Sequence, residues 1–102
     1  MTMLEIFKSK LPQGVEITKV RDNRGHYGMT DIWLDYKGTT GFCRLHKICA
    51  PGEADYICSV DLCSAMMSIA IERKDNELFK TWMHRQQALI FAHHKSASQE
   101  TY

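Results

Sequence analysis

The sequence lacks long apolar runs, a dominant sign of charge and repeated segments, and each absence argues against a class of protein. No stretch approaches the roughly eighteen apolar residues of a membrane span, and no basic segment followed by an apolar one opens the chain. Thirteen Lys and Arg residues balance twelve Asp and Glu residues, so no global field favours nucleic acid or an anionic membrane. We therefore expect a cytoplasmic protein without a membrane partner, in which any charged contact surface is local.

Sequence motifs for catalysis and cofactor binding are also lacking. The six glycines are spread singly, and no phosphate-binding loop, dinucleotide fingerprint, EF-hand loop or Gly-flanked nucleophile turn occurs. The 102 residues, 44% hydrophobic and 25% charged, are typical of one globular domain with its own core. We expect a single domain over residues 1–95, a flexible polar tail over residues 96–102, no enzymatic activity and no cofactor.

Four cysteines are too few for a disulfide framework, and in a cytoplasmic protein they are expected to be reduced thiols. With a histidine they nevertheless include enough ligand types for a zinc site. Residues 43 and 46, three apart on a predicted strand, point to opposite faces, which argues against shared coordination. We therefore favour a packing role for the cysteines. The less favoured alternative is a small structural zinc site made by Cys43, His46, Cys49 and Cys58.

The first half of the chain predicts a short helix followed by three strands. Thr2 and Glu5 have the spacing of a capping box, and a helix over residues 3–10 should end before Pro12. Strand-like segments over residues 15–20, 28–36 and 41–48 are separated by turn signals, which predicts an antiparallel meander. Two-residue turns at 24–25 and 38–39 would place Ile17 and Leu45 on either side of Ile32, so that the apolar rows share one face.

The second half of the chain changes to helical spacing. Ser59 or Asp61 could cap a helix that ends at Arg73, although residues 56–60 also suit a short fourth strand. A longer helix is predicted from a cap at residue 75 or 76 to about His94. The predicted fold is α+β, with a short helix, a three-stranded antiparallel β-meander and two C-terminal helices packed on one face of the sheet.

The other sheet face combines aromatic and charged residues and is our candidate for contact with a protein partner. The predicted register places Trp33 across from Arg44 and Asp31 across from His46, and it puts Val20 on the same face. Two alternatives are that the first helix covers this face, or that Trp33 and Arg44 form a cation–π pair on an ordinary surface. Aromatic and arginine side chains such as those on this face are common in binding hot spots. The candidate residues are Met29, Asp31, Trp33, Asp35, Phe42, Arg44 and His46.

The last predicted helix carries several basic residues, which raises a second possibility. A local basic strip could bind phosphates even though the chain has almost no net charge. The alternative function is therefore nucleic-acid binding through Lys80, His84, Arg85 and Lys95.

We favour a small non-catalytic protein-binding module that acts as a regulator or inhibitor. The expected partner is another protein, and a homodimer is compatible with the sequence. Small single domains of this kind include phage and mobile-element accessory proteins that block a host enzyme or defence complex, and this comparison rests on size class alone.

Overall fold

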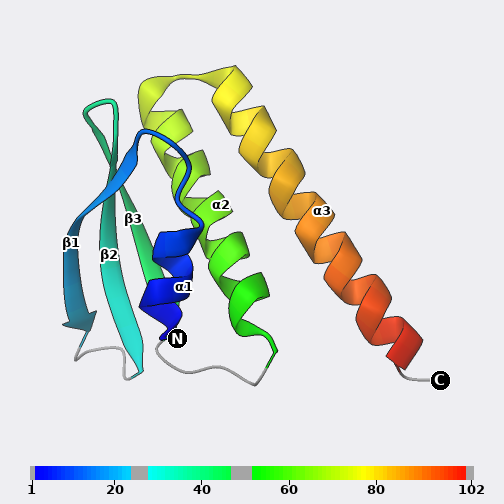
Figure 1. Ribbon diagram of the computed structural model, residues 1–102. Coiled ribbons are helices and arrows are strands. Elements are labelled where there is room, and N and C mark those ends of the chain that lie inside the picture. The colour runs from blue at the N-terminus through cyan, green and yellow to red at the C-terminus, as the bar shows by residue number, and fades with distance from the viewer. Residues whose placement is uncertain (1, 24–27, 47–51, 101–102) are drawn as a thin grey trace.

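The computed structural model describes residues 2–23, 28–46 and 52–100 and confirms the α+β fold. A three-stranded antiparallel sheet of order β1-β2-β3 lies on one side, with α1 and α2 on one of its faces (Figure 1). Helix α3 packs on α2 and lies farther from the sheet. The elements are α1 Met3–Ser9, β1 Val15–Asn23, β2 Met29–Tyr36, β3 Thr39–His46, α2 Ala54–Arg73 and α3 Asn76–Glu100.

Helix α1 begins with the capping box that the sequence predicts. The Glu5 backbone N–H donates to Thr2 Oγ1 at 3.1 Å, and the Thr2 backbone N–H donates to Glu5 Oε1 at 3.3 Å. These bonds satisfy amide groups that have no partner within the helix. The bond from the Thr2 N–H, together with one from the Thr2 hydroxyl, holds the pKa of the Glu5 carboxyl below its usual value. The cap orients α1 so that Met3 and Phe7 are buried in the core.

The turn between β2 and β3 shifts the predicted pairing by two residues. Lys37 and Gly38 both have positive φ and form the tight turn, so Ile32 pairs with Cys43 and Leu34 pairs with Gly41. The predicted pairing of Ile32 with Leu45 was therefore wrong. Because side chains alternate with a period of two, a two-residue shift keeps every side chain on its predicted face.

An irregularity in β1 changes both the cross-strand partners of its residues and the sheet face on which they lie. Ile17 pairs with Leu34 but Lys19 pairs with Trp33, so Thr18 is the extra residue of a β-bulge. Beyond it, Val20 lies opposite Ile32, and its predicted place on the Trp33 face was wrong. The predicted turn at residues 24–25 lies outside the described residues.

Both C-terminal helices are longer than predicted. Residues 56–60 belong to α2, so the alternative of a fourth strand there was wrong. The expected caps did not mark the start of the helix: the Ser59 hydroxyl donates to the Asp55 carbonyl within the helix at 2.8 Å. Asp75 does cap α3 through a bond from the Leu78 N–H at 3.0 Å. Helix α3 passes the predicted end at His94, and the segment expected to begin a tail is helical as far as Glu100.

Helix α2 supplies most of the core and joins the sheet to α3. Its buried side chains pack with Ile32, Leu34 and Leu45 of the sheet and with Phe7 of α1. In the described part of the chain, α2 is also the one helix long and apolar enough to cross a membrane, which the sequence analysis did not anticipate. A core helix has the same properties, and we assign its apolar composition to packing. The buried residues of α2 are Cys58, Leu62, Cys63, Ala65, Met66, Ile69 and Ala70.

The contact between β3 and α2 depends on the missing side chain of Gly41. A Cβ at this position would lie 2.5 Å from Ile69 Cγ1 and 2.8 Å from Ile69 Cδ1, both in the core. We predict that Gly41→Ala lowers the free energy of unfolding by about 1–3 kcal/mol through overpacking. Urea denaturation followed by circular dichroism measures this change.

Two further variants test that explanation. Thr40→Ala, at the exposed neighbouring position, should change stability little. Ile69→Val in the Gly41→Ala background should recover part of the loss, because it removes Cδ1, one of the two Ile69 atoms that crowd the new Cβ. Equal stabilities of Gly41→Ala and Thr40→Ala would contradict the proposed close contact.

Candidate binding surface on the sheet

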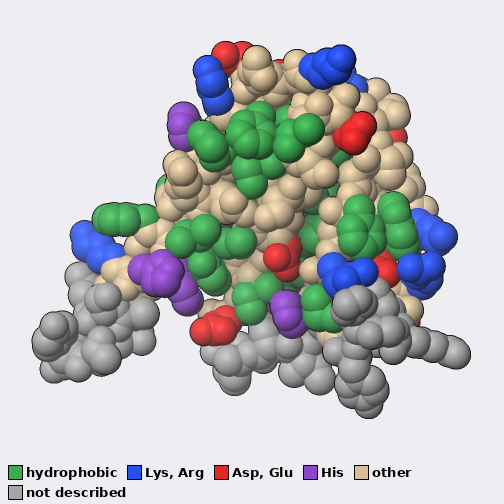
Figure 2. Space-filling view, turned by 180° about the vertical axis from the view of Figure 1, so that it is seen from behind, with side chains coloured by type: hydrophobic (Ala, Val, Ile, Leu, Met, Phe, Trp, Pro, Cys, Tyr) green, Lys and Arg blue, Asp and Glu red, His purple; other side chains and the backbone are tan. Residues whose placement is uncertain are grey.

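The sheet face opposite α1 and α2 carries the candidate surface. The buried residues of α1, Met3 and Phe7, pack with Ile32 and Leu34, so this helix does not cover the opposite face. Phe42 on that face is 42% exposed. Figure 2 shows apolar side chains bordered by Lys and Arg on the sheet side, at the right of the view. We call the central part of this face the Trp33 surface and define it as Lys19, Arg21, Asp31, Trp33, Phe42 and Arg44.

A buried carboxylate lies at the centre of the Trp33 surface. Asp31 is fully buried although it occupies the middle strand of an uncovered face, and its strand neighbours are Arg21 and Arg44. Arg21 Nη2 donates to Asp31 Oδ2 at 3.2 Å, and Arg44 Nε donates to Asp31 Oδ1 at 3.0 Å. A buried charge needs such partners because desolvation is costly. The two guanidinium groups are therefore held in place on either side of one carboxylate.

Two aromatic rings extend this ion-pair cluster along the strands. The ring centroids of Trp33 and Phe42 lie 5.2 Å apart, and the rings are tilted by 59°. Lys19 Nζ lies 4.9 Å and Arg21 Cζ 5.3 Å from the Trp33 centroid, while Arg44 Cζ lies 5.6 Å from the Phe42 centroid. Distances in this range allow cation–π attraction. The surface thus holds three cations against one carboxylate, with their side chains supported by aromatic rings.

The structure changes two predicted pairs within this surface. Trp33 lies across from Phe42 and not Arg44, while Asp31 lies across from Arg44 and not His46. The expected cation–π pair of Trp33 with Arg44 is replaced by contacts of Trp33 with Lys19 and Arg21.

The other predicted residues of this face lie nearer the strand ends. Met29 and His46 are paired at one end, where His46 is exposed. Asp35 lies toward the other end, across from Glu16, and its Oδ2 accepts from the Gly38 N–H at 3.4 Å. Met29 and Asp35 share the face of Trp33 without joining the ion-pair cluster, whereas His46, at the end of β3, lies near Asp61 of α2.

Sequence reasoning missed Lys19 and Arg21, because both reach this face only through the bulge at Thr18. One signal was present: Ile17 and Val20 are apolar residues at an odd spacing in one strand. An extra residue between them is needed to bring both to the apolar face. The same displacement carries Lys19 and Arg21 to the Trp33 surface.

The residues of the alternative nucleic-acid site do not form one continuous strip. Lys80, His84 and Lys95 are exposed and fall within about 60° of one another around α3. Arg85 lies on another side, with its Cζ 4.6 Å from the Trp82 ring centroid. Of the other histidines on this helix, His93 stacks on Tyr56 at 3.9 Å between centroids.

The structure describes three of the four residues of the alternative zinc site, and these three differ in exposure. Cys43 and Cys58 are buried in the core, whereas His46 is exposed, and Cys49 lies outside the described residues. Across residues 2–23, 28–46 and 52–100, no group of three or more His, Cys, Asp or Glu side chains could hold a metal ion. Burial raises the pKa of Cys43 to about 12, which keeps the thiol protonated.

Comparison with known proteins adds no assignment: no protein-family model, curated protein or solved structure matches this chain.

Asp61 on α2 is a partly buried carboxylate with an incomplete set of hydrogen-bond partners. Its Oδ2 is buried without a hydrogen bond, and burial raises the pKa of this carboxyl to about 6, a shift that the nearby His46 opposes. As the pH rises from about 4 to about 6, the unfolded chain loses this proton while the folded chain keeps it. The contribution of Asp61 to the free energy of unfolding should therefore fall between about pH 4 and about pH 6 and stay reduced at neutral pH.

We predict that Asp61→Asn raises the free energy of unfolding at pH 7 by about 1 kcal/mol, after allowance for solvent screening. At pH 4 the difference from the native chain should be small, because Asp61 is then protonated in the folded state. Chemical denaturation at pH 4, 5, 6 and 7 measures this dependence, with Glu72→Gln, an exposed change on the same helix, as the control. A pH-independent effect of Asp61→Asn would contradict the assignment.

Proposed function

We propose that this protein is a non-catalytic binding module that regulates or inhibits a partner protein by contact through the Trp33 surface. The observation that carries the proposal is the cluster of Arg21 and Arg44 on the buried Asp31. The exposed Phe42 and half-buried Trp33 lie beside it. Arginine and tryptophan are among the residues that contribute most to binding energy in protein interfaces.

Preorganisation supports a role in binding. Long side chains lose conformational entropy when an interface forms, and this loss weakens affinity. In the Trp33 surface, Asp31 and the two rings already restrict both arginines and Lys19. A partner would meet two arginines that are already paired with Asp31 before contact.

The charge of the surface favours an anionic region on the partner. Two arginines pair with the buried Asp31, and Lys19 lies over the neighbouring Trp33 ring, so the Trp33 surface carries a local excess of positive charge. Glu16 and Asp35 face each other farther along the strands. Electrostatic complementarity therefore orients an acidic segment toward the Arg21 and Arg44 end of the sheet.

A protein partner fits this surface better than single-stranded nucleic acid. Proteins that bind single strands offer open aromatic faces on which bases stack. Here Lys19 and Arg21 already lie over the Trp33 ring. We base the regulatory or inhibitory role, including the phage and mobile-element type, on the small size of the domain and on its proposed action through surface contact.

Nucleic-acid binding through α3 is the second candidate, and the exposed line of Lys80, His84 and Lys95 favours it. It predicts a gel shift that weakens as salt increases and that is lost in a Lys80→Ala/Lys95→Ala variant. Variants of the Trp33 surface should leave such a shift unchanged. Absence of a shift at low salt would exclude this candidate.

For the Trp33 surface we predict that the double variant Lys19→Glu/Phe42→Ser keeps its fold but binds the partner at least tenfold more weakly. Both side chains are exposed and neither belongs to the Asp31 ion pairs. Affinity capture with mass spectrometry first identifies the partner, and calorimetry with that purified protein then gives the dissociation constants.

The matched control is Lys80→Glu/Phe91→Ser, which makes the same two replacements at exposed positions on α3. It should bind like the native chain, and the affinity of the native chain should fall as salt increases. If the control loses binding and the Trp33 variant retains it, the contact surface lies on α3 and the proposal is wrong.

A further inference from the structure

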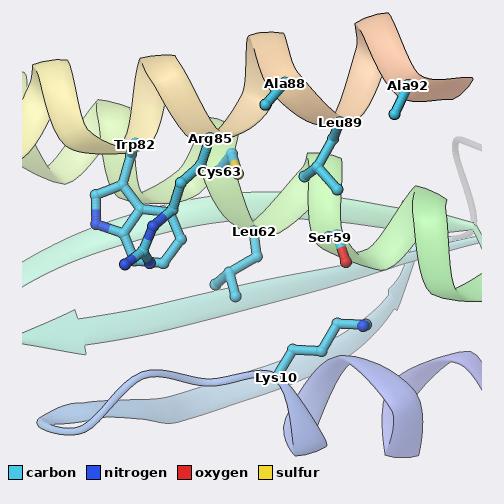
Figure 3. A pocket seen from close by; sticks show the side chains of 9 residues that line it. All are labelled: Lys10, Ser59, Leu62, Cys63, Trp82, Arg85, Ala88, Leu89 and Ala92. Atoms are coloured by element: carbon cyan, nitrogen blue, oxygen red, sulfur yellow. The ribbon is translucent and has the colours of Figure 1, made fainter.

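A groove between α2 and α3 offers a second contact site on the helical side of the molecule. It has a volume of about 530 Å³ and is mainly apolar. Leu62 and Leu89 project into it, Trp82 closes one end, and Ala88 and Ala92 of α3 form one wall (Figure 3). A volume of this size is typical of a site that takes a ligand or several partner side chains.

The length and the small wall residues of the groove match an α-helix. From Trp82 to Ala92 the groove follows α3 for ten residues, which is roughly 15 Å or three helical turns. Ala88 and Ala92 are both exposed. Alanine allows the backbone of an incoming helix to approach closely, as in other tight helix–helix contacts. An apolar groove between two helices is also a recurring docking site for amphipathic helices.

The charged residues that line the groove are all cationic. Arg85 holds its guanidinium over the Trp82 ring, and Lys10 reaches the groove from the end of α1. Lys10 Nζ also pairs with Asp55 at 2.6 Å, but neither Asp55 nor another described acidic residue lines the groove. The complementary partner therefore carries acidic residues beside its apolar face.

We propose that this groove docks an acidic amphipathic α-helix of a partner protein. The apolar side chains of the helix would pack on Trp82 and Leu89, and its Asp or Glu side chains would face Arg85 and Lys10. A second copy of this chain fits less well, because its α3 would bring the cations Lys80 and Lys95 toward Arg85. The proposal rests on the groove alone and does not require the Trp33 surface.

Two synthetic peptides of fifteen residues test the proposal with the full chain. Both have leucine at positions 3, 7, 10 and 14 on an Ala and Gln background; one carries Glu beside the leucine stripe and its twin carries Lys. Fluorescence anisotropy should show the Glu peptide binding at least tenfold more tightly than the Lys twin. In the NMR spectrum of the labelled protein, the Trp82 indole and the Ala88 and Ala92 amides should shift.

Matched variants locate the contact. Ala88→Trp should fill the groove and weaken binding of the Glu peptide at least tenfold, whereas Gln87→Trp, an exposed neighbour outside the groove, should not. Arg85→Glu should reverse the preference toward the Lys twin, whereas Lys80→Glu, the same charge change on the same helix, should keep it. Circular dichroism confirms that each variant folds.

Several results would overturn the proposal. These are failure of both peptides to bind, equal binding of the two, or equal effects of Ala88→Trp and Gln87→Trp. Sodium decanoate serves as a small amphiphile in the same NMR experiment. If it shifts the resonances of the groove residues and the peptides do not, the groove is a site for a small amphiphile. A dimer in sedimentation that Ala88→Trp abolishes would assign it to a second copy. The Lys19→Glu/Phe42→Ser variant should bind the Glu peptide normally, which separates this test from that of the Trp33 surface.

Discussion

The packing of α2 on β3 is the interaction on which the rest of the structure depends. Gly41 lets Ile69 approach the strand closely, and this contact places α2 between the sheet and α3. A sheet of three strands needs such a cover, because isolated strands bury too little apolar surface to be stable. Helix α1 completes the same side through Met3 and Phe7. In the described part of the chain, all the helices therefore lie on one side of the sheet, and none of them covers the opposite face (Figure 1).

The uncovered face is stabilised by charge pairing and ring contacts instead of by a second apolar layer. Asp31 would be costly to bury alone, and the arginines on both neighbouring strands compensate it. The guanidinium group of Arg21 lies over the Trp33 ring and that of Arg44 over the Phe42 ring, and both rings remain partly accessible. The same contacts that make this face stable also preorganise it. A stable uncovered face with fixed cations is the physical basis for the binding role that we propose.

The two proposed contact sites lie on different layers and share one chemical character. The Trp33 surface uses arginines on a sheet, and the groove uses Arg85 and Lys10 beside an apolar floor. Each concentrates positive charge locally in a chain of nearly neutral total charge. Local charge of this kind guides orientation and association without a strong long-range field. Both proposed sites would therefore favour acidic partners without a strong field around the whole protein.

The sequence by itself determined the features that depend on short-range chemistry. The capping box of α1, the α+β order and the faces of β2 and β3 follow from local spacing, and a register error of two residues left those faces intact because strand side chains alternate. The tertiary structure decided what depends on pairing between distant segments. The bulge at Thr18 brings Lys19 and Arg21 to Trp33, and the packing of α3 on α2 forms the groove at Trp82. The odd spacing of Ile17 and Val20 indicates an extra residue in the strand, but the pairing of that strand and the separation of two helices are set by long-range packing, which local periodicity does not encode.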